Sequence, residues 1–168
     1  MTDEKRLARA KKQESLALFQ GYLAETLGQF NAGYLVSLKL DPDREVLVIS
    51  GQNKKDPTIT LPYNRIVSFV VEDETSLVKS GSGIGRALAG GLLFGGAGAV
   101  VGALSGKGKT KTAWYGTLTY KNKTGETSQI VLKELTLGDP KSKTLSATTF
   151  ETVVAGIVRR YAAAITEL

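Results

Sequence analysis

Two glycine- and lysine-rich patterns in the sequence have residue types that could hold phosphate. Residues 103–110, ALSGKGKT, match a relaxed phosphate-binding loop, in which backbone amides and lysines surround phosphate oxygens. Such a loop joins a strand to a helix, whereas the residues from Lys111 onward read as the strand TAWYGTLTY. Gly96, Gly98 and Gly102 approximate a dinucleotide pattern, but the acidic residue expected about twenty positions later is missing. We therefore assign no nucleotide to either motif.

The composition removes most other reaction chemistry. The chain has 168 residues with no cysteine and no histidine, so thiolate nucleophiles, disulfides and the commonest general base and zinc ligand are all missing. The carboxylates show no spacing that suggests an acid–base pair. We expect one non-catalytic domain with no cofactor and no metal. The segment MTDEKRLARAKK continues into an amphipathic stretch and does not read as a signal peptide, which predicts a cytoplasmic protein. If the chain binds a membrane, the expected place is peripheral on its inner face.

Positive charge is concentrated in one part of the chain. The formal net charge is +6, and no acidic residue occurs between Glu74 and Glu126. A local positive field attracts anionic lipid headgroups or nucleic acid phosphates. The residues that we predict to contact an anionic partner are Lys79, Arg86, Lys107, Lys109 and Lys111.

The most informative feature is an uncharged apolar insert within these basic residues. Residues 87–106 are more than half glycine and alanine, and one crossing of a bilayer would place the flanking strands on opposite sides. A hairpin that turns at residues 95–98 avoids this conflict, with arms of about ten residues, or roughly 15 Å each if helical. Small residues recur every four positions, which suits close backbone packing; they are Ala87, Gly91 and Gly95, then Gly98, Gly102 and Gly106.

The insert is therefore predicted to contact a membrane or another copy of the chain. We place it at residues 81–109. Its predicted contact residues are Leu88, Gly91, Leu92, Leu93, Phe94, Gly95, Gly98, Val101, Gly102 and Gly106.

The rest of the chain reads as strands between two helices. Apolar residues at helical spacing predict an amphipathic helix within residues 1–31; they are Leu16, Phe19, Leu23, Leu27 and Phe30. Short β-like runs follow at 33–40, 44–50, 58–62, 64–74, 112–122 and 127–135. A second helix is predicted from Phe150 to Leu168, with a capping box of Thr148 and Glu151 at its start. This order predicts an α+β fold, an antiparallel sheet or partly open barrel closed by a C-terminal helix.

The segment TITLPYNRIVSFVVED resembles the pleckstrin-homology-like (PH-like) and GRAM-like domains of bacteria. The resemblance rests on Leu61, Pro62, Tyr63, Asn64, Arg65 and Ile66, and on an insert similar to the glycine-rich hairpin that some members carry. It implies a PH-like domain over residues 32–168 that binds or scaffolds, is often membrane-linked and contributes no catalytic residues. No basic motif for phosphoinositides carries over.

Three functions remain open at this point. The first is association with an anionic membrane surface through the insert, and the second is a soluble homo-oligomer or filament assembled through the same insert. The third is nucleic-acid binding by Lys107, Lys109 and Lys111 together with aromatic residues of the following strand. In that strand Trp114 and Tyr120 share a face with core residues, which leaves Tyr115 outside.

Overall fold

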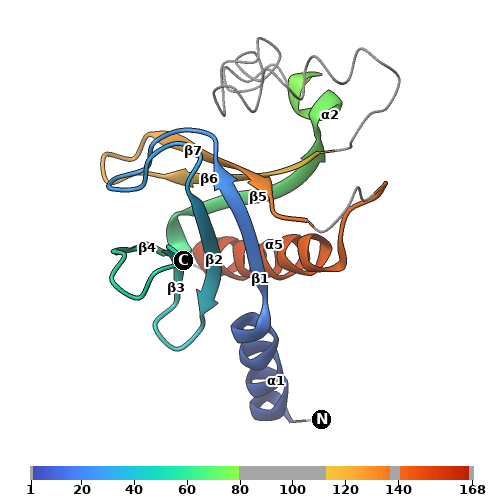
Figure 1. The fold of residues 1–168 in the computed structure, drawn as a ribbon. Coiled ribbons are helices and arrows are strands. Elements are labelled where there is room, and N and C mark those ends of the chain that lie inside the picture. Colours follow the sequence, from blue (N-terminus) through green and yellow to red (C-terminus); the bar gives the residue numbers. More distant parts are fainter. Residues whose placement is uncertain (1, 80–112, 137–140, 167–168) are drawn as a thin grey trace.

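The computed structural model describes residues 2–79, 113–136 and 141–166, drawn as ribbons in Figure 1. The strands of these ranges form one antiparallel sheet in the order β4-β3-β2-β1-β7-β6-β5. Their bounds are β1 Leu18–Leu23, β2 Leu35–Asp41, β3 Val46–Ser50, β4 Thr58–Pro62, β5 Ile66–Asp73, β6 Trp114–Lys121 and β7 Thr127–Glu134. The helices are α1 Asp3–Leu16, α2 Glu74–Lys79 and α5 Leu145–Thr166, with a 3-10 turn at Tyr63–Arg65. The predicted α+β class is confirmed.

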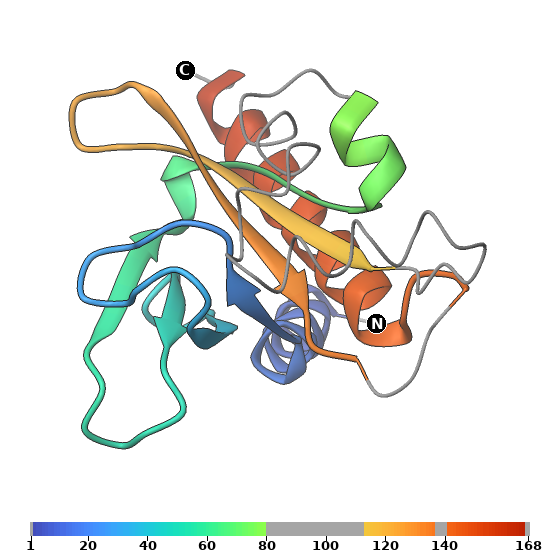
Figure 2. The same ribbon diagram turned by 45° about the horizontal axis from the view of Figure 1, so that its top comes forward.

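The C-terminal helix closes the sheet and completes the core. Figures 1 and 2 show α5 lying along one face of the strands. Phe150 and Val154 are fully buried, and the ring of Phe150 meets that of Phe69 edge-on at 4.9 Å between centroids. Phe19 of β1 completes this cluster at 5.1 Å from the Phe69 ring. The described part of the predicted helix therefore packs its apolar face on the sheet, with Phe150, Val154 and Ile157 all buried.

The predicted capping box of α5 is wrong. The helix begins at Leu145, and the Thr144 hydroxyl accepts a hydrogen bond from the Ala147 amide at 3.1 Å, as an N-cap residue does. Thr148 lies inside the helix. The carboxylate of Glu151 is used elsewhere, because it accepts from the Val71 amide at 2.9 Å. That contact ties the helix to edge strand β5.

The N-terminal helix exists but is shorter and less amphipathic than predicted. It ends at Leu16, and Phe19 and Leu23 belong to β1 instead. Both side chains face the core, because every second residue of β1 is buried, and β1 is paired on both sides, with β2 and with β7. The five apolar residues fit a helical spacing, but backbone pairing with a strand on each side makes the segment a strand. In α1 itself, Glu14 is the buried residue.

Candidate functional site

The insert leaves and re-enters the sheet at one place, which we call the root of the insert. β5 ends at Asp73, β6 begins at Trp114, and these two residues pair in the antiparallel ladder. Directly opposed residues in such a ladder have Cα atoms about 4.5–5.5 Å apart. The two ends of the intervening segment are therefore anchored side by side, as a hairpin requires.

A short helix fixes the outgoing side of the root. Asp73 caps α2, its carboxylate accepting from the Ser76 amide at 2.7 Å. Leu77 of α2 is 3% exposed and belongs to a small second cluster with Ala24, Tyr115 and Val131. In Figure 2, α2 stands on the near side of β5 and β6, whereas α5 lies on the far side. The insert thus starts from a helix that is packed onto the sheet.

The environment of Tyr115 differs from the one predicted. The sequence placed this residue outside the sheet, available to stack on a base, but its side chain is 3% exposed and packs in the cluster under α2. Burial, and then the charge of Glu74, raise the pKa of its phenol. Trp114 and Tyr120 are half-buried against the main core. The aromatic surface on which the nucleic-acid hypothesis depended is not present at β6.

Most of the predicted contact residues lie outside the described residues. Of the basic set, Lys79 ends α2 at the root of the insert. The remaining basic residues, Arg86, Lys107, Lys109 and Lys111, fall in the segment 80–112, and so do all the apolar and glycine residues predicted to contact a membrane or another copy. The described residues thus provide the anchor of the predicted site.

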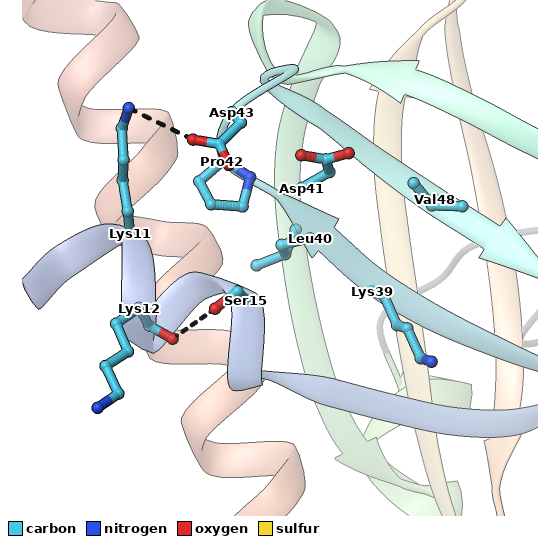
Figure 3. A pocket seen from close by; sticks show the side chains of 9 residues that line it. All are labelled: Lys11, Lys12, Ser15, Lys39, Leu40, Asp41, Pro42, Asp43 and Val48. Atoms are coloured by element: carbon cyan, nitrogen blue, oxygen red, sulfur yellow. Dashed lines mark hydrogen bonds and ion pairs between the residues drawn. The ribbon is translucent and has the colours of Figure 1, made fainter. Parts of the chain in front are cut away.

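One hollow in the described part of the chain contains lysines but does not have the geometry of an anion site. It has a volume of about 550 Å³ and lies between α1 and the β2–β3 turn. Figure 3 shows that the side chains of Lys12 and Lys39 point away from each other, while Lys11 reaches Asp43 at 3.7 Å. Because its cations diverge and one is paired with a carboxylate, this hollow would hold an anion poorly.

A second cavity has a buried acid in its wall, which the sequence reasoning missed. It measures about 220 Å³ and is lined by Leu18, Gln20, Glu134, Leu135, Thr136, Thr144 and Ser146. Glu134 is 8% exposed, and its Oε1 has no hydrogen-bond partner among the described residues. The signal was present in the alternation of β7, where Ile130 and Leu132 face the core and Glu134 occupies the next inward position.

Two other features of the described residues bear on function. No helix within the described ranges has both the length and the apolar character needed to cross a membrane. Residues 2–79, 113–136 and 141–166 also contain no group of three acidic residues close enough to hold a metal ion.

Comparison with known proteins gives one match. The model of the family described as "Glycine zipper containing PH domain" matches residues 25–115, more than half of the 168 residues. The match begins just after β1, runs through the root of the insert and ends in β6, and it confirms the resemblance to PH-like domains that contain a glycine zipper. No curated protein and no solved structure matches the chain.

Proposed function

This chain belongs to the family of glycine zipper containing PH domains, and on that basis we propose that it binds an anionic membrane surface through its insert. PH-like domains are generally non-catalytic binding modules. The observation that carries the proposal is the pairing of Asp73 with Trp114. Since both ends of the insert are held at one place on the sheet, the apolar segment can enter a bilayer surface and return while the domain stays outside.

The order of charges along the chain supports this orientation. Glu72, Asp73 and Glu74 lie at the root, next to the sheet, where Asp73 serves as a helix cap and Glu74 occupies the first turn of α2. Basic residues follow from Lys79 onward and flank the uncharged stretch 87–106 on both sides. Cations near an anionic bilayer contribute about 1 kcal/mol each. The basic residues are thus the ones expected at the headgroups.

Liposome flotation of the full chain tests the proposal. We expect flotation with vesicles that contain phosphatidylserine and weaker flotation with neutral vesicles. Exchanging Lys107, Lys109 and Lys111 for glutamate should weaken binding to the anionic vesicles by on the order of 3 kcal/mol, roughly a hundredfold. The remaining binding should also be less sensitive to salt.

A matched variant tests whether binding depends on the position of the lysines or only on the total charge of the chain. Lys5→Glu, Lys12→Glu and Lys39→Glu make the same change in total charge at exposed positions on or beside α1, which lies at the opposite end of the molecule from α2 in Figure 1. This control should float like the unmodified chain. Equal flotation of both triple variants, or no flotation of the unmodified chain, would reject membrane binding through the insert.

Assembly through the insert is the second candidate function, favoured by the four-residue spacing of its small residues. Gly98→Leu with Gly102→Leu adds bulk at this spacing and should dissociate an assembly that needs close backbone contact. Ala99→Leu with Ala103→Leu places the same leucine side chains one position away and serves as the control. Size-exclusion chromatography without detergent measures the size of each variant. If the unmodified chain elutes as a monomer, or if both double variants elute at the same size, this assembly is excluded.

A further inference from the structure

The buried acid Glu134 lies where the pattern of its strand calls for an apolar side chain. Ile130 and Leu132, the preceding inward-facing residues of β7, both belong to the core cluster. Glu134 pairs with Gly21 of β1 and is 8% exposed. A polar residue at an inward position destabilises a core unless it is fully hydrogen-bonded or has a function.

Only part of the hydrogen-bonding capacity of this carboxyl group is used. The Thr144 hydroxyl donates to Oε2 at 2.8 Å, while Oε1 has no partner among the described residues. An ionised carboxylate can accept about four hydrogen bonds. The nearby lysine at the start of α5 does not supply them, because Lys143 pairs with Glu151 at 2.9 Å. The acid therefore lacks a cationic partner within the described part of the chain.

The cavity beside Glu134 combines apolar and polar walls. Its volume of about 220 Å³ is several times the ~30 Å³ that a water molecule occupies in the liquid. Leu18 and Leu135 are 36% and 40% exposed, so alkyl surface lines the mouth, and Gln20, Thr136 and Ser146 add polar groups. The terminal torsion of a carboxyl group is soft, so the oxygen without a partner can turn toward a group that enters.

We propose that this cavity binds an alkylammonium or alkylguanidinium group, with its charged head on the Glu134 carboxylate and its alkyl chain against Leu18 and Leu135. A single carboxylate beside neutral hydroxyls suits one monovalent organic cation, whereas a hard divalent ion takes six or more oxygen ligands. The group can come from a free small amine or from a basic side chain of a peptide. This site is separate from the root of the insert and does not depend on membrane binding.

The test is a titration of the full chain with butylammonium chloride, followed by the NMR shifts of the Leu135 and Thr144 amides. We expect saturable shifts that sodium chloride at equal ionic strength does not reproduce. Glu134→Gln keeps the shape and removes the charge, and it should weaken binding about tenfold or more. Glu126→Gln, an exposed change in the β6–β7 turn, should bind like the unmodified chain.

Two further arms examine the alkyl contact and the source of the cation. Leu135→Ala should weaken butylammonium more than methylammonium, since only the longer chain reaches the mouth of the cavity. A capped Gly-Lys-Gly peptide that binds as well as butylammonium identifies a basic side chain as a competent ligand, and weaker peptide binding identifies the free amine. Shifts that do not saturate, that sodium chloride reproduces, or that persist in Glu134→Gln overturn the proposal.

Discussion

Arg160 of α5 donates a hydrogen bond to the Glu14 carboxylate of α1 at 3.1 Å, which joins residues 146 positions apart in the chain. Glu14 is 4% exposed and also accepts from the Tyr63 hydroxyl at 3.1 Å. Burial, and then the charge of Glu14, raise the pKa of Tyr63, so the phenol keeps the proton that it donates. The N-terminal helix is held to the domain by this polar contact at its last turn.

Glu14→Ala should therefore lower stability, because it leaves the buried Tyr63 hydroxyl without this acceptor. The expected loss is about 1–3 kcal/mol. Glu14→Gln retains an acceptor and loses only the pair with Arg160, whose side chain is 44% exposed, so its cost should stay below about 1 kcal/mol. Urea unfolding measures both, with the exposed Glu4→Ala as the control. Equal losses for alanine and glutamine would contradict the role given to Tyr63.

Ile157→Asp should unfold the domain or come close to doing so. The side chain is 1% exposed on the packed face of α5, and an unpaired charge there costs on the order of 3–5 kcal/mol, a large part of the stability of a small domain. Ala155→Asp places the same charge on the exposed face of the helix and should be tolerated. Thermal melts of the two variants make the comparison, and normal melting of Ile157→Asp would place the helix outside the core.

Replacing residues 82–107 by a short Gly-Ser linker should leave the domain folded. The ends of the deleted segment are held by the Asp73–Trp114 pair, and loop-closure entropy changes slowly with length. Far-UV circular dichroism and a cooperative melt within a few degrees of that of the full chain are expected. An unfolded product would mean that the insert belongs to the folding core.

The stability of the protein should carry a pH dependence that Glu134 causes. Burial raises the pKa of this carboxyl group, and the hydrogen bond from Thr144 opposes the shift only in part. At a pH between the ordinary pKa of the unfolded chain and the raised pKa of the folded chain, the folded chain holds a proton that the unfolded chain has lost; above both values the group is a carboxylate in both states. This contribution to stability is present at acidic pH and is lost as the pH rises through the raised pKa.

In Glu134→Gln that loss disappears, so the variant should gain stability relative to the unmodified chain as the pH rises. Urea unfolding from about pH 4 to about pH 8 measures the difference. Glu126→Gln, which changes an exposed carboxylate, should show no such trend. A difference between Glu134→Gln and the unmodified chain that stays constant over this range would contradict the raised pKa.

The sequence predicted the elements whose signals are local. The β-like runs 112–122 and 127–135 leave only residues 123–126 between them, and the β6–β7 turn lies there. Gly125 has φ +86°, and the Asn122 side chain accepts from the Thr124 and Glu126 amides. The strand runs and the stripe of α5 were equally readable, because alternation and helical periodicity each follow from the geometry of one element.

The elements that the sequence did not predict are fixed by distant partners. β1 is a strand because β2 and β7 flank it, and Gly21 allows this approach, since a Cβ there would lie 2.8 Å from the Lys133 carbonyl oxygen. Glu14 is buried by contacts with Tyr63 and Arg160, which lie 49 and 146 positions further along the chain. The burial of Tyr115 depends likewise on Leu77 of α2 and on Ala24, which follows β1. Such contacts become visible only when the chain is folded.

The position of the root also determines how the domain responds to force. Within the described ranges β5 is an edge strand whose partner is β6, and the Asp73–Trp114 pair is the end of that ladder. Tension on the insert would separate these two strands from one end and load their hydrogen bonds one after another instead of together. The contact between the Val71 amide and Glu151 lies two residues further in and would be the first point at which α5 shares the load. The β5–β6 pair is thus the part of the sheet that a pull from the insert would load first.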